Sequence, residues 1–265
     1  MTSERTVELH STTLGSAGPR VAFCHGLFGQ GKNWTGIARG LATDHRVTLL
    51  DLPNHGRSGW TDELSYAAMA DAVHALLAQE APGYEVTLVG HSMGGKVAMA
   101  LALRHPTLVR RLCVVDVSPV RYRSMGTFAG YVRGMRALDL NTLTDRAAAD
   151  RGLQEAVPDP TVRGFLLQNL RRDGQGWRWQ MNLQLLGDHL DVLGDWPTPS
   201  APPYPGPTLW VAGAGSDYIT SDYAPAMRQL FPRVTLLTVK NAGHWVHSEQ
   251  PEVFLAALKA FLARS

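Results

Sequence analysis

The sequence has few cysteines, no long apolar run and little net charge, so it lacks features typical of secreted, membrane and nucleic-acid-binding proteins. Its 265 residues include two cysteines, too few for a disulfide framework. No apolar run approaches the roughly 18 residues that a membrane helix needs, and a net charge of +2 offers no basic surface for nucleic acid. The opening stretch MTSERTVELHSTTLG carries charges and lacks the apolar centre of a signal peptide. We therefore expect no membrane span, no nucleic-acid partner and a cytoplasmic location.

Motifs for metals and nucleotide cofactors are also missing. No group of histidine, cysteine and aspartate residues has the spacing of metal ligands. No phosphate-binding glycine-rich loop follows the first predicted strand. The sequence thus predicts neither a metal nor a cofactor, and it leaves the oligomeric state open.

Short apolar runs alternate with helical patterns along most of the chain. Hydrophobic residues make up 45% of the sequence and charged residues 18%, enough apolar mass for a substantial core. The runs are continuous, which is typical of parallel strands buried on both faces. Strands are predicted at Val21–Cys24, Val47–Asp51, Val86–Val89, Leu112–Val117, Thr208–Ala212 and Val234–Val239. Helices are predicted at Asn33–Leu41, Ser65–Glu80, Met93–Arg104, Asp222–Leu230 and Pro251–Ala263. This order predicts an α/β fold with a doubly wound, mostly parallel sheet.

The alternation breaks once, between Val120 and Trp196, where helical patterns follow one another. Helices are predicted at 126–139, 141–151 and 161–172. They are followed by the proline-dense stretch WPTPSAPPYPGP, which contains too many prolines to form a regular helix or an interior strand. We interpret residues 121–196, called the cap segment below, as a helical cap inserted into a single domain with a core of residues 1–120 and 197–265. The alternative is an independent second domain, for which about 75 residues is short.

Aromatic side chains are frequent in the cap segment. They either line an acyl pocket or form the core of the segment itself, and the sequence does not decide between these. The residues are Tyr122, Phe128, Tyr131, Phe165, Trp177, Trp179 and Trp196.

The stretch VTLVGHSMGGKVAM places Ser92 between glycines where a predicted strand gives way to a predicted helix. A serine at such a junction can simply cap the helix. In the Gly-x-Ser-x-Gly turn of hydrolases, however, it is a nucleophile held out of the sheet. Gly90 and Gly94 leave space where a Cβ would strike the neighbouring turn, and Gly95 lets the helix approach the sheet. The position at the carboxyl edge of the strands, where α/β sheets bind ligands, favours the nucleophile.

A serine hydroxyl needs a base to attack at neutral pH. In folds with this serine turn the histidine comes last in the chain, after the final strand. The loop after Val234–Val239 contains His244, which we predict to be the base. We interpret His25 and His91 as structural, and His247 as a packing or capping residue of the last helix.

Acyl transfer also needs donors directed at the oxyanion. One is the backbone N–H of Met93, the residue after the serine, and the other is predicted to be the N–H of Leu27 in the glycine-flanked loop HGLFG.

The segments HGLFGQGKNW, DLPNHGRSG, GHSMGGKVAM, VVDVSPV and NAGHWVH occur in this order along nearly the whole chain. In them the sequence resembles the α/β-hydrolase family of small bacterial esterases and thioesterases, a group related to the animal α/β-hydrolase domain-containing protein 11. The resemblance implies the α/β-hydrolase fold and a cofactor-free serine hydrolase. Its substrates would be small esters of short or medium acyl chains, with acyl-thioesters as a further class. Pro53 stands where relatives often carry arginine.

The acid that orients His244 has two candidate positions. Many relatives carry it after the strand at 208–212, but the matching position here is Ser216, and Asp217 lies one residue too late. Asp116 ends the preceding strand on the same edge as the serine, and the resembling family uses this aspartate with the serine as an accessory partner. We predict Asp116 as the acid and Ser216 as its support, with Asp217 as the alternative.

These residues together predict ester hydrolysis through a covalent acyl-serine intermediate. The alternatives are other chemistry on the same three side chains, such as carbon–carbon bond hydrolysis or cofactor-free haloperoxidation, and a binding module without catalysis. Epoxide and haloalkane hydrolysis are disfavoured, because those relatives carry a carboxylate at the position of Ser92.

Overall fold

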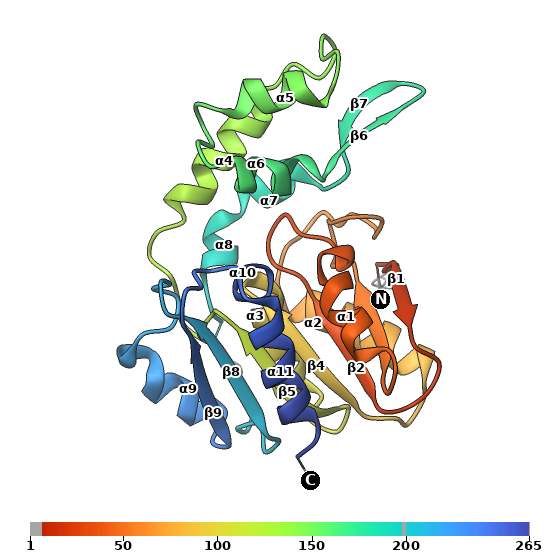
Figure 1. Ribbon diagram of the computed structural model, residues 1–265, viewed down its shortest axis with the longest axis vertical. Helices are drawn as coiled ribbons and strands as arrows, with labels where there is room; N and C mark the ends of the chain where they lie inside the picture. The colour runs from red at the N-terminus through yellow and green to blue at the C-terminus, as the bar shows by residue number, and fades with distance from the viewer. Residues whose placement is uncertain (1–6, 198–199, 265) are drawn as a thin grey trace.

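A seven-stranded sheet with the order β1-β3-β2-β4-β5-β8-β9 forms the centre of the protein (Figure 1). The computed structural model describes residues 7–197 and 200–264, so the start of the N-terminal stretch and two residues of the proline-dense stretch lie outside the described residues. All strand pairs in this sheet are parallel except β1 with β3. The strands are β1 (Ser11–Leu14), β2 (Arg20–Cys24), β3 (Arg46–Leu50), β4 (Val86–His91), β5 (Val109–Val115), β8 (Thr208–Gly213) and β9 (Val234–Val239).

The predicted doubly wound, mostly parallel sheet is confirmed, with strand ends shifted by a few residues. Two details of the prediction were wrong. Strand β1 was missed, because its sequence STTL is largely exposed on the sheet edge and has no apolar run. Strand β9 is the opposite edge and is not buried on both faces, since Leu236 is 54% exposed.

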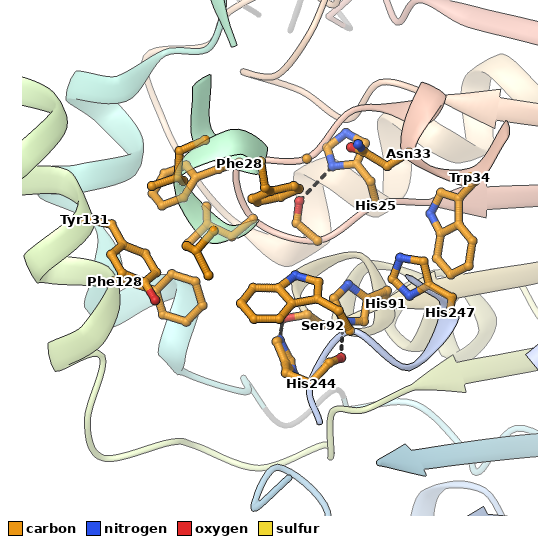
Figure 2. Close-up of a pocket in the computed structure, with 17 residues that line it drawn as sticks. His25, Phe28, Asn33, Trp34, His91, Ser92, Phe128, Tyr131, His244 and His247 are labelled. Atoms are coloured by element: carbon orange, nitrogen blue, oxygen red, sulfur yellow. Dashed lines mark hydrogen bonds between the residues drawn. The ribbon is translucent and has the colours of Figure 1, made fainter. Parts of the chain in front are cut away.

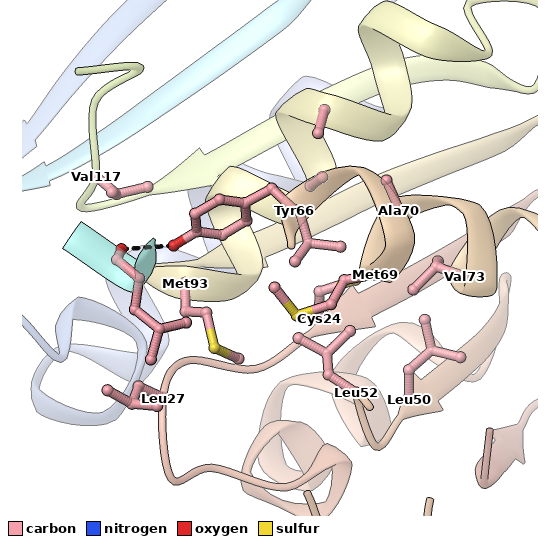
Figure 3. Close-up of a cluster of buried hydrophobic side chains, with 14 of the residues drawn as sticks. Cys24, Leu27, Leu50, Leu52, Tyr66, Met69, Ala70, Val73, Met93 and Val117 are labelled. Atoms are coloured by element: carbon pink, nitrogen blue, oxygen red, sulfur yellow. Dashed lines mark hydrogen bonds between the residues drawn. The ribbon is translucent and has the colours of Figure 1, made fainter. Parts of the chain in front are cut away.

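Helices cover both faces of the sheet, and each face has its own apolar cluster. Alternate residues of a strand point to opposite faces, so Val21 and Phe23 of β2 pack with α1 and α11, whereas Ala22 and Cys24 pack with α2 and α3. Figure 3 shows the second face, where Cys24 lies close to Met69. The helices of the core are α1 (Thr35–Leu41), α2 (Tyr66–Glu80), α3 (Met93–Arg104), α9 (Ala224–Leu230), α10 (Val246–Glu249) and α11 (Pro251–Leu262).

Local signals explain where these helices begin. The Ser65 hydroxyl accepts a hydrogen bond from the Ala68 N–H and caps α2, as predicted. The predicted helix at 33–41 begins as a 3-10 turn, Gly31–Trp34, before α1, and the helix predicted from Asp222 begins as another, Ser221–Tyr223, before α9.

The cap segment lies between β5 and β8 and extends beyond the end of the sheet at which α10 is found (Figure 1). Its division from the core as a capping unit stays a prediction. Its elements are α4 (Gly126–Ala137), α5 (Arg146–Leu153), α6 (Pro160–Leu167), β6 (Leu170–Asp173), β7 (Gly176–Trp179), α7 (Leu183–Asp188) and α8 (Leu190–Gly194).

Two helix predictions in the cap segment were partly wrong. The helix predicted at 161–172 ends at Leu167, and the chain then forms the antiparallel hairpin of β6 and β7, in which Leu170 pairs with Trp179. The helix predicted at 141–151 begins only at Arg146, because the Asp145 carboxylate accepts the Ala148 N–H and caps it there.

A buried lysine attaches the end of the cap segment to the core. Lys96 of α3 is 1% exposed, and its ammonium donates to the carbonyls of Gly194 (2.9 Å) and Asp195 (2.7 Å). Beside it, the Tyr66 hydroxyl donates to the Leu193 carbonyl at 2.7 Å. These carbonyls end α8, where a positive charge complements the helix dipole.

Two further properties concern the described residues only. Within 7–197 and 200–264 no helix combines the length and apolar character needed to cross a membrane. In the same ranges, no three metal-ligating side chains are grouped so that they could hold an ion.

Candidate active site

Ser92 stands on a strained turn between β4 and α3. Its φ of 53° and ψ of −122° lie in a region that side-chain-bearing residues rarely adopt. The turn is tight enough to need the flanking glycines, since a Cβ on Gly90 would lie 2.2 Å from the Gly94 oxygen. A Cβ on Gly94 would lie 2.4 Å from the His25 oxygen, and one on Gly95 would lie 2.6 Å from Val117. The sequence expectation for these glycines therefore matches the local packing.

The Ser92 hydroxyl meets His244 from the loop after β9. The distance from His244 Nε2 to Ser92 Oγ is 3.0 Å, and the distance from Nδ1 to the Asp116 carboxylate is 2.8 Å. An ionised carboxylate can only accept, so the Nδ1 proton points at Asp116 and Nε2 is left to accept the serine proton. The three side chains predicted from distant parts of the sequence thus form one hydrogen-bonded chain.

Asp116 follows β5 and is completely buried. It has a positive φ of 51°, which turns the chain sharply out of the strand. Its second carboxylate oxygen accepts the Gly213 N–H at 3.0 Å, and the Ser216 hydroxyl donates to the same oxygen as His244. Asp217, the alternative acid, is exposed to solvent. The geometry brings Asp116 and Ser216 together with His244 and leaves Asp217 outside.

The two predicted oxyanion donors lie next to the serine and line one cavity with it. Gly26 comes so close that a Cβ there would lie 3.3 Å from the Ser92 Cβ, which places the following residue, Leu27, beside the serine. Met93 is the first residue of α3, where N–H groups have no partner inside the helix. Neither the Leu27 nor the Met93 N–H donates to another group within the described ranges 7–197 and 200–264. Both amides are available to a ligand.

Two cavities adjoin Ser92. The larger, with a cavity volume of about 30 Å³, lies between core loops and the cap segment, and Figure 2 shows Phe128 and Tyr131 on one side of it and His244 on another. The smaller, about 20 Å³, is lined by both oxyanion candidates. Of the cap aromatics named from the sequence, Tyr122, Phe128, Tyr131 and Phe165 line these cavities. Trp177 and Trp179 belong to the β6–β7 hairpin, and Trp196 packs in the core away from both cavities.

Sequence reasoning missed two residues that contact His244. The ring of Tyr218 stacks on the imidazole at a centroid distance of 4.2 Å. His91, expected to be structural, donates through Nε2 to the backbone carbonyl of His244 at 2.8 Å (Figure 2). It thereby fixes the loop that carries the imidazole.

Other histidines near the site are buried and neutral. Burial lowers the pKa of His25 to about 4 and those of His55 and His247 to about 3, and it lowers the pKa of His91 well below its ordinary value. A hydrogen bond agrees with the neutral form of His25: its Nε2 accepts the Leu52 N–H at 2.9 Å, so this nitrogen carries no proton. His247 packs, as expected, with its ring stacked 4.0 Å from that of Trp34.

The chain is similar to known proteins over nearly its whole length. The alpha/beta hydrolase fold model matches residues 19–251. The sn-1-specific diacylglycerol lipase ABHD11 of Mus musculus is 39% identical over 92% of this chain and 81% of its own. The esterase YbfF of Escherichia coli K12 is 31% identical over 91% of this chain and 92% of its own. A solved marine microorganism esterase superposes with a TM-score of 0.93 at 32% identity, covering 96% of this chain and 99% of that one.

The buried histidines predict loss of stability in mild acid. For a base whose folded pKa is depressed, the unfolded state binds more protons between the folded pKa and about 6.5, so the free energy of unfolding falls as pH drops through this window. The four histidines His25, His55, His91 and His247 would each contribute up to about 1.4 kcal/mol per pH unit below 6.5.

Urea unfolding between pH 7 and pH 5 measures this slope. Carboxylates remain mostly ionised in that range, so they interfere little. The variant His247→Phe keeps a ring on Trp34 and should lose roughly a quarter of the slope. An unfolding free energy that does not change between pH 7 and pH 5 would contradict the assignment of neutral histidines.

Proposed function

The chain belongs to the alpha/beta hydrolase family, and on that premise we propose that it cleaves carboxylic esters through a covalent acyl-serine intermediate. It is an ester-bond hydrolase, because relatives named lipase and esterase align with more than nine-tenths of it. The single observation that carries the proposed mechanism is the hydrogen-bonded chain from Asp116 through His244 to Ser92, beside a cavity.

In the proposed reaction, Ser92 Oγ bonds to the ester carbonyl carbon while His244 Nε2 takes the hydroxyl proton. The carbonyl oxygen becomes an oxyanion, which the N–H groups of Leu27 and Met93 stabilise. The carbon–oxygen bond to the alcohol then breaks, and His244 returns its proton to the leaving oxygen. Water repeats the sequence on the acyl-serine with His244 as base, releasing the acid.

Asp116 would hold His244 in the tautomer that leaves Nε2 free and would stabilise the imidazolium. Ser216 and the Gly213 N–H donate to this carboxylate in addition to His244 and so compensate its burial.

We further propose that the cap segment, residues 121–196, covers the site and limits the acyl chain to short or medium length. Support comes from the cavity beside Ser92, whose walls include aromatic side chains of the cap segment. Acyl-thioesters present the same carbonyl and belong in the same substrate panel. The unpaired cysteines Cys24 and Cys113 support a reducing compartment, and we propose the cytoplasm.

Ser92→Ala should lower the hydrolysis of nitrophenyl acetate by at least ~10⁴-fold, because the proposed acyl-enzyme forms on the Ser92 hydroxyl. The fold should survive, since the glycines shape the turn, and far-ultraviolet circular dichroism checks this. A fluorophosphonate probe should label Ser92 in the wild type and in the control Ser124→Ala, whose serine is exposed on the cap segment. Labelling at another residue, or turnover in Ser92→Ala, would refute the serine mechanism.

Asp116→Asn should lower kcat by about 10³- to 10⁴-fold, because an amide favours the wrong tautomer of His244. Asp217→Asn is the matched control at the alternative position and should change kcat by less than about threefold, whereas Ser216→Ala should fall between the two. Steady-state kinetics on one ester compares all three. A larger loss in Asp217→Asn than in Asp116→Asn would transfer the role to Asp217.

Phe128→Ala should shift the chain-length preference, because Phe128 lines both cavities next to Ser92. With nitrophenol as a constant leaving group, we expect the ratio of hexanoate to acetate turnover to change by about tenfold. Trp177→Ala, an aromatic of the cap segment outside the cavities, should leave the ratio unchanged. Equal ratios in both variants and the wild type would mean that the cap aromatics do not select the acyl chain.

A further inference from the structure

A buried asparagine of the cap segment bonds to the loop that carries Leu27. Asn169 lies in the turn between α6 and β6, has no exposed surface and donates through Nδ2 to the Phe28 carbonyl at 2.7 Å. Its Oδ1 accepts from the Gln30 side chain at 2.7 Å. Asn169 therefore contacts the loop at two points although 141 residues separate it from Phe28.

The contacted turn is strained at Phe28. The Gly29 N–H donates to the Gly26 carbonyl at 2.9 Å and closes a four-residue turn, in which Phe28 is the third residue with a φ of 61°. Turns with a positive φ at this position favour glycine or asparagine, and an aromatic residue adopts it only when the surroundings hold it there. Leu27, whose N–H is a proposed oxyanion donor, is the second residue of the same turn.

Side chains hold the peptide groups on both sides of Phe28. His55 Nε2 accepts the Phe28 N–H at 3.2 Å, and Asn169 donates to the Phe28 carbonyl. His55 comes from the core, where its Nδ1 donates to the Pro53 carbonyl. Asn169 comes from the cap segment, and its backbone is anchored in turn by the Gln180 N–H at 2.8 Å.

We propose that Asn169 is a positioning residue for oxyanion stabilisation: it holds the Gly26–Gly29 turn so that the Leu27 N–H points at the reacting carbonyl oxygen. The inference rests on the proposed function and assigns the cap segment a part in catalysis besides covering the site. When the cap segment is seated, the turn is held on both sides. When it is displaced, the strained turn relaxes and the Leu27 donor is lost.

The test compares Asn169→Ala with Gln168→Ala in the full chain. Gln168 is the neighbouring cap residue and its side chain accepts from Asn33 at 2.8 Å, so the control removes a contact between cap and core without touching the turn. The first readout is kcat and KM for nitrophenyl acetate. The second is the inhibition constant of a trifluoromethyl ketone, to which Ser92 adds with transfer of its proton to His244, leaving an oxyanion on the former carbonyl oxygen.

Loss of one oxyanion donor lowers kcat by about 10²- to 10³-fold in other hydrolases. A loosened donor should cost less, so we expect a loss of about 10- to 100-fold in kcat for Asn169→Ala, with KM within about twofold. The ketone inhibition constant should rise by the same factor as kcat/KM falls. Gln168→Ala should keep all three values within about twofold of the wild type.

Two results would overturn the inference: unchanged ketone inhibition in Asn169→Ala, or an equal loss in Gln168→Ala, which would indicate general cap attachment. If Asn169→Ala does not fold, Gln30→Met, which removes the amide that donates to Asn169 Oδ1 and to the Gln168 carbonyl, decides the question by a smaller change in the same direction or by none. Fluorophosphonate labelling of Ser92 is measured in parallel. If wild-type turnover does not depend on Ser92, the proposed function fails; if it does and Asn169→Ala behaves as wild type, only the present inference fails.

Discussion

The arrangement around Ser92 depends on one buried carboxylate. Asp116 has no exposed surface, and no lysine or arginine of the described residues forms an ion pair with it. A buried anion is tolerated only when donors surround it, and here they come from Gly213, Ser216 and His244. Because these donors lie at the end of β8 and in the loops after β8 and β9, satisfying the carboxylate also fixes both loops. The same bonds that make the burial of Asp116 possible therefore hold the imidazole next to Ser92.

Groups without charge fix the rest of the imidazole's position. His91 donates to the backbone carbonyl of His244, and the Tyr218 ring stacks on its face. A second positive charge at His91 would oppose the imidazolium that the proposed mechanism forms at His244. Burial lowers the pKa of His91 well below its ordinary value, so His91 can orient its neighbour without this repulsion.

How much the sequence predicts depends on how far apart the interacting residues lie. Ser92 is recognisable because glycines, strand and helix surround it within one short segment, and His244 because chain order in this fold is fixed. Predicting Asp116 required a choice between carboxylates that follow two different strands. Asp217 stands one residue from the usual position of the acid, and side chains at adjacent positions of a turn point in different directions. The hairpin of β6 and β7 was missed because the helical interpretation of 161–172 covered most of β6.

Asn169 carries no local signal of its contact with Phe28, nor does Lys96 of its contact with the end of the cap segment. Both partners lie about a hundred residues or more away, and a single sequence has no pattern that pairs them. The sequence around Tyr218 gives no signal of its contact with His244 either, because the pattern of an aromatic residue in a loop is the same whether it stacks on a histidine or faces solvent. Such residues become visible only when the fold brings the segments together.

Several attachments between cap segment and core are polar and directional, beside the apolar packing that the two share. Besides Lys96 and Asn169, the Asn182 N–H donates to the Asn54 carbonyl at 2.9 Å. An apolar contact weakens gradually as two surfaces slide, whereas a buried amide or ammonium that leaves its acceptor loses its bond before water can replace it. Displacement of the cap segment would therefore break these bonds as well as the apolar contacts. Because one of these bonds ends on the turn that carries Leu27, the position of the cap segment in this structure is also the one in which the proposed oxyanion donor is held in place.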